Sequence, residues 1–497
     1  MPQKIENHGV HLVRQMGLLG LIATGVCSMV GAAINVIPLM VQRNVPGIGS
    51  HVLLAYLLAV IPTALAALAY AQLASAMPRA GGSYVYASRA LSPYLGFIAS
   101  FSQWFGLTTA IGVVSYLLIP FLRDVAIALE MTHLASSLSS GGVRVGLALL
   151  FVWAFAAVNV RGVQLYQKTL IPLMFLMVIG GAIVIPWGFV FDHSDFIAAL
   201  SRREGLALSL PGPQPIDWSA LLAASAILFS TFIGFDSIAQ AGGEARNPGR
   251  ALPMAIGCSV AAVAAYYLLF TASIYHAVPW NFVAERARST DLTAPGLLGY
   301  LLPKGWTVAM IGGAAVALIN DLPAMILAVS RLLFAWSEDG IFPSWVGRVH
   351  ARWHTPHRAI GVSAGMASLA ILGSHFAGDF FLGVDILITS MLINFILICI
   401  SVLALPGRNP VLAARLRFGK SLAARVALGG GGAAVLTVLL ATHVAKDLTA
   451  PAAWYFRSTW LWLLVVGAGS ALFRLEMSQL RRRGVDVHKI FSTLPPE

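Results

Sequence analysis

The chain has 497 residues, of which 58% are hydrophobic and only 10% are charged, and its mean hydropathy is +0.80. A soluble domain carries roughly 25% charged residues, so this composition excludes a soluble protein, and the length leaves no room for a large soluble domain. The formal net charge of +12 suggests a nucleic-acid partner. The Lys and Arg residues gather between apolar runs, however, and we expect no nucleic-acid binding.

Twelve apolar runs are long enough to cross a bilayer, which takes roughly 20 helical residues. Backbone groups in lipid must find partners inside the protein, and runs this long and apolar favour helices over barrel strands. The sequence therefore predicts an all-α integral membrane protein with 12 transmembrane helices, near residues 17–42, 51–77, 93–122, 144–159, 168–190, 219–242, 252–277, 305–335, 359–377, 380–405, 425–443 and 458–473.

The basic residues predict how the chain is oriented. If segment 1–16 is cytoplasmic, the inner segments hold most of the 32 Lys and Arg residues, as the positive-inside rule requires. Both termini are then cytoplasmic, and the basic tail 474–497 touches anionic lipid. The short termini fit a multi-pass protein of the bacterial inner membrane, a plasma membrane. The oligomeric state stays open.

Small residues interrupt the first and the sixth run. Gly31 lies inside the first, and Gly234 lies inside the sixth, five helices later. Such residues let helices pack closely, but interruptions at corresponding places are typical of transporters built from inverted repeats. This pattern predicts one five-helix repeat over 17–205, an inverted second repeat over 206–406, and two further helices over 407–473.

Two carboxylates lie inside the apolar runs, where a charge is costly and rarely accidental. Asp236 lies in the sixth run. Desolvation favours the neutral acid, so Asp236 could load and release a proton, or it could cap the amides of a broken helix. Asp321 lies in the eighth run, about one turn from Met325. It could bind a cation, attract an amine or line a wet vestibule.

Four motifs resemble, in order and spacing, those of the amino acid–polyamine–organocation (APC) superfamily, in particular the bacterial amino acid permeases. The motifs are Ser28 to Ile34; Met77 to Tyr86 with Pro93 to Phe97; Glu244, Asn247, Pro248, Arg250 and Pro253; and Ser330 and Arg331 followed by Glu338 to Pro343. They span residues 25 to 343, whereas residues after about 410 match the family only in hydropathy.

The resemblance implies the LeuT-type fold, with broken helices one and six, and transport of amino acids, polyamines or related cations by alternating access. Amides freed by unwinding would bind a substrate carboxylate, and freed carbonyls would bind an ammonium. The family's carboxylate contacts fall on Gly31, Ala32 and Ala33, and its amine contacts on the carbonyls of Met29, Ser230 and Ile233. Phe232 resembles the aromatic gate of helix six.

The resemblance also bears on selectivity and coupling. It places Ile111 and Met325 at the walls of the side-chain pocket, which favours neutral amino acids, although Met325 could be ordinary core packing. Asp236 matches an acidic position that helps couple transport to protons, which predicts proton-coupled symport. Met177 stands where proton-coupled relatives often carry a lysine, so exchange without obligatory proton coupling stays open, as does the choice between protons and sodium.

The inner loops and the resemblance predict an ion-pair network that closes an inner gate. Its members are Arg79, Glu244, Arg331 and Glu338. No cofactor or metal is expected. The glycine run 429–432 lacks the Lys-Ser/Thr of a phosphate loop, and nothing fixes a ligand geometry for the histidines His350, His354 and His357.

Cysteines and polar clusters limit the other classes of function. Cys27, Cys258 and Cys399 all fall inside apolar runs, so no structural disulfide and no disulfide-linked heavy chain are expected. A membrane enzyme would need clustered His, Asp, Glu or Ser residues, and these are sparse here, so we predict that the protein is not an enzyme. A nutrient receptor that binds solute without moving it stays open.

Overall fold

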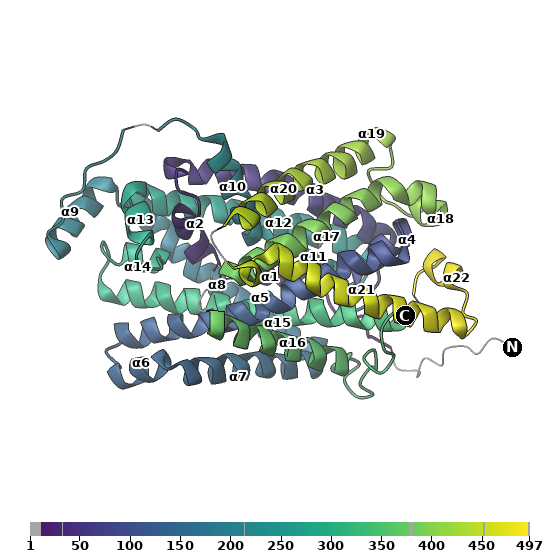
Figure 1. Ribbon diagram of the computed structural model, residues 1–497. Helices are drawn as coiled ribbons and strands as arrows, with labels where there is room; N and C mark the ends of the chain where they lie inside the picture. The colour runs from purple at the N-terminus through teal and green to yellow at the C-terminus, as the bar shows by residue number, and fades with distance from the viewer. Residues whose placement is uncertain (1–10, 32, 213, 378–380, 451–452, 496–497) are drawn as a thin grey trace.

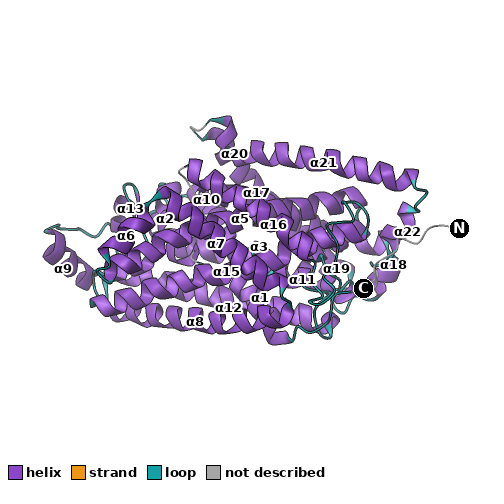
Figure 2. Ribbon diagram, turned by 90° about the horizontal axis from the view of Figure 1, so that it is seen from below, coloured by secondary structure: helices purple, strands orange, loops and turns teal. Residues whose placement is uncertain are grey.

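The computed structural model describes residues 11–31, 33–212, 214–377, 381–450 and 453–495 and is helical throughout, with no strand in these ranges. It contains 12 spans long and apolar enough to cross a membrane, as the sequence predicts (Figures 1 and 2). The spans are built from α1 (Leu18–Met29) with α2 (Ala33–Asn44), α3 (Val52–Ala76), α5 (Pro93–Ala128), α7 (Gly141–Val160), α8 (Val163–Val190), α10 (Trp218–Phe229) with α11 (Asp236–Gln240), α12 (Pro248–Ala277), α15 (Lys304–Glu338), α16 (His357–Ala377), α17 (Phe381–Arg408), α19 (Leu422–Arg425) with α20 (Gly432–Thr449), and α21 (Ser458–Arg482).

Shorter elements connect the spans. They are α4 (Gly82–Ala90), α6 (Thr132–Ser139), α9 (His193–Glu204), α13 (Trp280–Ala287), α14 (Ala294–Leu298), α18 (Pro410–Ala414) and α22 (Val487–Ser492), the 3-10 turns Gly49–His51, Ser230–Phe232 and Trp454–Phe456, and a π-helical turn Val426–Gly431. Figure 1 places α18 and α22 at one end of the bundle and α9, α13 and α6 at the other. We call these the α22 end and the α9 end.

Five predicted boundaries were wrong by more than a turn: the ends of α5, α20 and α21 and the starts of α8 and α12. The α8 and α21 boundaries illustrate the cause. Helix α8 begins at Val163 instead of 168, and α21 continues to Arg482 instead of 473. In both cases the helix continues through charged and polar residues. These residues lower the hydropathy and so fall outside the predicted span, but their backbone hydrogen bonds remain helical. A helix therefore ends where its hydrogen bonds end, not where its apolar run ends.

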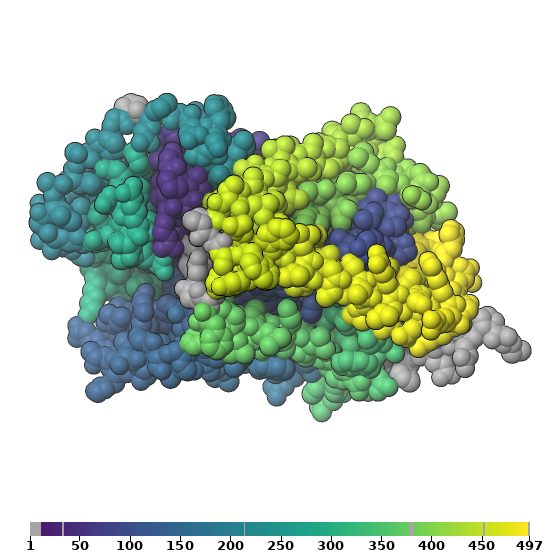
Figure 3. All heavy atoms as spheres, in the orientation of Figure 1, coloured from purple at the N-terminus to yellow at the C-terminus, as the bar shows by residue number. Residues whose placement is uncertain are grey.

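The core of the bundle lies around α5 and α15, the two longest helices, at 36 and 35 residues. Their most apolar windows are 78% and 72% buried, against 22% for the last two spans. Figure 3 shows these C-terminal helices, in yellow and yellow-green, lying across one face of the molecule. The central helices are therefore the ones placed to enclose a site.

The first and sixth spans are both broken, as the sequence predicts. Helix α1 ends at Met29, and α2 begins at Ala33. In the sixth span, α10 passes into a 3-10 turn ending at Phe232 before α11 begins at Asp236. Gly234 lies between them with φ +138°, and a Cβ there would collide with the carbonyl of Ser28. Only glycine tolerates both the dihedral and the close approach.

Two glycines of the run 429–432 allow close helix packing. A Cβ on Gly429 would lie 2.7 Å from the carbonyl oxygen of Cys399, and one on Gly432 would lie 2.9 Å from its sulfur. Small residues thus let the eleventh span approach α17. The cysteines lie within helices α1, α12 and α17 with free thiols.

Candidate functional site

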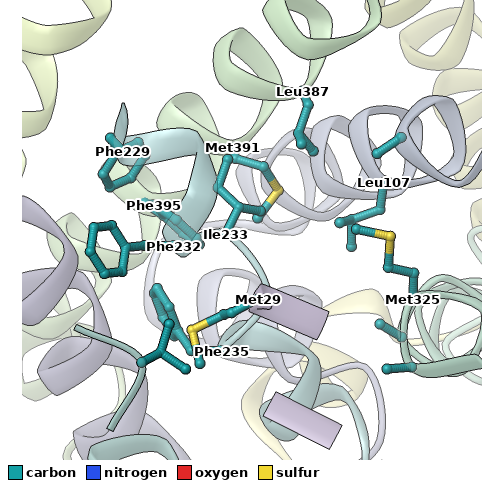
Figure 4. Packing of buried hydrophobic residues seen from close by; sticks show 14 of the residues in the cluster. Met29, Leu107, Phe229, Phe232, Ile233, Phe235, Met325, Leu387, Met391 and Phe395 are labelled. Atoms are coloured by element: carbon teal, nitrogen blue, oxygen red, sulfur yellow. The ribbon is translucent and has the colours of Figure 1, made fainter. Parts of the chain in front are cut away.

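The two helix breaks lie side by side, and a tyrosine of α12 ties them together. The hydroxyl of Tyr267 lies 2.5 Å from the carbonyl oxygen of Met29 and 3.0 Å from that of Thr231, so it donates to either break. The hydroxyls of Ser28 and Ser237 are 2.9 Å apart and link α1 to α11. Figure 4 shows Met29 and Ile233 near each other, with Met325 across from them.

A cavity of about 370 Å³ opens beside the breaks. Five of the residues predicted from the sequence line it: Met29, Ser230, Ile233, Asp321 and Met325. Most of the remaining wall is aliphatic. From the breaks the cavity continues along α5 to Arg123 and Asp124, near the end of that helix. It also reaches Asp291 and Thr293, in the segment between α13 and α14 at the α9 end.

Four of the predicted substrate-binding residues that the structure describes do not line this cavity: Gly31, Ile111, Phe232 and Gly234. Ile111 is fully buried in α5, and its neighbours Ala110 and Val113 line the cavity instead. Phe232 packs against the rings of Tyr56 and Tyr267, with centroids 6.0 and 5.2 Å apart. Phe232 therefore stands behind the break, where it supports the Tyr267 ring.

The predicted carboxylate-binding amides are only partly available. The N–H of Gly31 donates to the carbonyl of Met29 at 3.1 Å. Ala32 lies outside the described residues, and Ala33 is the first residue of α2. The Met29 carbonyl, a predicted amine contact, already accepts from Gly31 and lies within reach of the Tyr267 hydroxyl. The Ser230 carbonyl accepts from the N–H of Ile233 at 3.2 Å.

Asp236 is fully buried at the start of α11 and does not line the cavity. Its Oδ1 accepts from the N–H of Gly234 at 3.1 Å, and its Oδ2 accepts from Nε2 of Gln103. Gln103 in turn accepts from Gln240 at 3.1 Å, and Gln240 donates to Ser83 at 2.8 Å. The carboxylate thus caps the broken helix and ends a buried polar chain. Its role in proton coupling stays a prediction.

A second polar junction continues this chain to α17. The Ser83 and Tyr70 hydroxyls are 2.6 Å apart, and Asn394 donates to the Tyr70 hydroxyl at 2.7 Å. Sequence reasoning missed Gln103, Tyr70, Asn394 and Tyr267. The available signal was an amide or a tyrosine inside an apolar run, because such groups usually require a buried partner.

Buried ion pairs close the α22 end below the breaks. Arg331 donates to Glu244 through Nε at 3.1 Å and through a terminal nitrogen at 2.5 Å, and each side chain is 1% exposed. Arg89 and Asp339 form a second bidentate pair, at 2.5 and 3.0 Å, which the sequence analysis did not predict. These bonds join α15 to the loop after α11, and the residue that follows α15 to α4.

The other two predicted gate residues lie at the same end. Arg79 donates to the carbonyl of Pro495 at 3.1 Å, and Glu338 is the last residue of α15. The C-terminal segment also contacts Arg89, which donates to the carbonyl of Thr493 at 3.0 Å. The tail therefore packs against the closed end.

The histidines His350, His354 and His357 lie just before and at the start of α16. The rings of His350 and His357 lie 5.3 Å apart, while His354 bonds through Nδ1 to the carbonyl of His11 at 3.2 Å. Across the described ranges, no group of three or more His, Cys, Asp or Glu side chains is placed to hold a metal ion.

Twelve apolar spans, two of them broken at a shared cavity, define a multi-pass membrane protein with the architecture of a solute carrier. The sequence model of the amino acid permease family matches residues 16–468. The chain belongs to this family and hence to the APC superfamily, as its motifs predict.

Curated relatives agree with this membership. The chain is 29% identical to an uncharacterized transporter of Mycobacterium tuberculosis over 363 residues, covering 72% of this chain and 74% of that protein. It is 27% identical to cationic amino acid transporter 4 of Mus musculus, over 73% of this chain and 55% of that protein. It is 26% identical to the low-affinity putrescine importer PlaP of Escherichia coli, over 69% of this chain and 70% of that protein.

Proposed function

We propose that the protein is a secondary active transporter that moves amino acids or related amines across the plasma membrane by alternating access. The observation that carries this proposal is the paired helix break at the base of a cavity that reaches the α9 end and is closed toward the α22 end by buried ion pairs. A site open to one side and sealed from the other is what alternating access requires.

We take the orientation of this transporter in the membrane from the sequence prediction. Both termini and the α22 end face the cytoplasm, and the α9 end faces outward, so the arrangement described corresponds to an outward-open state. Spans one to five and six to ten form two inverted repeats. The corresponding breaks in the first and sixth spans support this assignment.

The walls and the relatives bear on substrate class. The cavity is mostly aliphatic, which suits an apolar substrate body and agrees with the predicted lean toward neutral amino acids. The named relatives include a cationic amino acid transporter and a putrescine importer, which widens the class to amines. We therefore propose an aliphatic amino acid or amine as substrate.

For coupling we propose protons carried by Asp236, the buried acid of the broken sixth span. Its bond to the N–H of Gly234 joins its protonation state to the conformation of the break. The alternative is exchange of one substrate for another, in which Asp236 acts only as a helix cap. Both schemes use the same cavity.

The test is uptake of labelled amino acids and amines into proteoliposomes with an imposed inward proton gradient, with and without matching solute inside. Accumulation driven by the gradient alone is the expected result. Uptake that needs internal solute identifies an exchanger. Saturable binding without any uptake, in vesicles where a control carrier is active, contradicts the proposal and identifies a non-transporting receptor.

A further inference from the structure

The carboxyl group of Asp321 is buried beside the cavity, and one of its oxygens has no hydrogen-bond partner among the described residues. It lies in the middle of α15 and is 5% exposed. Its Oδ1 has no hydrogen-bond partner in the described part of the chain. A buried carboxylate without a partner is costly, and in a membrane it marks a functional site by default.

The cationic side chains of the same cavity do not serve as its partner. Arg123 donates to the adjacent Asp124 at 2.8 Å. Arg144 donates to the carbonyl of Tyr116 at 3.2 Å and lies 3.7 Å above that tyrosine ring. The cavity therefore contains, at its inner part, a carboxyl group that neither of these arginines pairs with.

The carboxylate also fills the space in front of the first helix break. A Cβ built on Gly31 would lie 2.5 Å from Oδ2 of Asp321 and 3.2 Å from its carboxyl carbon. This is the place at which the family resemblance predicts the carboxylate of an amino acid substrate. The Gly31 N–H is already bonded to Met29, so the break offers less to an anion than the sequence suggests.

From this arrangement we infer that Asp321 takes the place of the substrate's own carboxylate and selects aliphatic amines that lack one at this end. A substrate carboxylate beside Asp321 would add a second acceptor and a like charge, whereas an ammonium supplies the partner that Asp321 lacks. The aliphatic walls accommodate a methylene chain. This inference deepens the proposed function, since it names the substrate class of the same cavity.

Cadaverine and lysine form a matched pair of probes, because they differ only by the carboxylate of lysine. The inference is tested without requiring transport by measuring how strongly each probe raises the thermal unfolding midpoint of the purified full chain in lipid nanodiscs. We expect the wild type to bind cadaverine at least about tenfold more tightly than lysine, since a charge-assisted hydrogen bond is gained in one case and a like-charge contact in the other.

Asp321→Asn should weaken cadaverine binding by roughly 10- to 100-fold and remove the preference over lysine. Asp195→Asn, at the exposed start of α9, is the matched control and should leave both affinities unchanged. If Asp321→Asn does not fold, the comparison of the two probes on the wild type still decides.

Equal or tighter binding of lysine by the wild type overturns the inference, as does unchanged cadaverine binding by Asp321→Asn. Repeating the measurement with sodium chloride in place of choline chloride tests whether Asp321 binds an inorganic cation instead of an amine. Stabilisation by sodium that Asp321→Asn removes, with cadaverine binding intact, assigns the carboxylate to sodium and overturns the inference. A wild type that prefers cadaverine but moves nothing in proteoliposomes supports the inference while the proposed transport fails.

Discussion

Arg331 and Glu244 form a bidentate ion pair at the α22 end, with each side chain 1% exposed. The pair joins the long core helix α15 to the loop that follows the broken sixth span. It therefore ties the break to the closed end of the bundle, and it must separate whenever the cavity opens in that direction.

Removing one partner of this pair should open the α22 end. Arg331→Ala leaves Glu244 buried and uncompensated, a cost of about 3–5 kcal/mol to the closed arrangement. A cysteine introduced at the buried Ala80, in a background without native cysteines, should then react faster with a membrane-impermeant maleimide added from that side.

The charge-swapped double variant Arg331→Glu with Glu244→Arg should restore slow labelling, because the pair is rebuilt. Arg352→Ala, at an exposed loop position, serves as the control. Unchanged labelling and unchanged transport in Arg331→Ala would remove this pair from the gate.

Tyr267→Phe should weaken the link between the two breaks. The substitution removes the hydroxyl that donates to Met29 or Thr231, leaving a buried carbonyl without its donor at a cost of about 1–3 kcal/mol. We expect a lower thermal unfolding midpoint and slower substrate uptake. Tyr266→Phe is a matched control on the same helix, because no hydrogen bond from its hydroxyl is found within the described residues.

Asp236→Asn should separate proton coupling from substrate movement. If Asp236 carries the proton, the variant loses gradient-driven accumulation and keeps exchange of internal for external substrate. Asparagine can still accept from Gly234, but its amide then faces the amide of Gln103 as a second donor.

Gln103→Leu controls for this structural effect, because it removes the same hydrogen bond and keeps the carboxylate. Loss of accumulation in Asp236→Asn but not in Gln103→Leu supports proton transfer. Equal losses in both variants would reduce Asp236 to a helix cap.

Local sequence patterns were sufficient to predict the 12 spans and both breaks. Hydropathy identifies an apolar run wherever it packs, and Gly234 is required by its own dihedral angle. Contacts between distant segments were harder to predict. The partner of Asp236 lies 133 positions away in the chain, and that of Arg89 lies 250 positions away.

Rotation about a helix axis explains the misplaced pocket wall. Successive helical residues point about 100° apart, so an alignment error of one position moves a side chain from the cavity into the core. Ile111 is buried in α5, whereas Ala110 lines the cavity. Nor could the sequence show that the Gly31 amide turns back onto Met29, since this depends on how the chain leaves α1.

The attachment of α9 should depend on acid pH. The Tyr300 hydroxyl donates to Glu204 at 2.5 Å, and Arg286 donates to it at 2.5 and 2.7 Å. The Tyr300 bond, and then Arg286, hold the pKa of Glu204 below its ordinary value of 4.5 although desolvation opposes them. Because this pKa is lowered in the folded state, the stabilisation is present above pH 4.5 and is lost as the pH falls below it.

Hydrogen exchange in α9, corrected for intrinsic rates, should therefore be faster at about pH 3.5 than at pH 6 in the wild type. Glu204→Gln should show fast exchange at both pH values. Glu285→Gln serves as the control, because Glu285 is 81% exposed and lies 4.0 Å from Arg288. A pH-independent exchange rate in the wild type would contradict the prediction.

Truncation before α22 should loosen the α22 end without breaking the Arg89–Asp339 pair. Arg89 donates to the carbonyls of Thr493 and Ile490, and its guanidinium lies 5.2 Å from the ring centre of Phe491. Removing residues 487–497 exposes this buried arginine to water and deletes a cation–π contact worth about 0.5–1 kcal/mol or more.

The truncated protein should show a lower unfolding midpoint and faster labelling of a cysteine at position 80. Replacing Arg481, Arg482 and Arg483 by alanine tests the alternative that the tail acts by binding lipid, since these exposed residues end α21 and leave α22 in place. If the alanine variant reproduces the truncation and Phe491→Ala has no effect, the tail stabilises the closed end through the bilayer and not through Arg89.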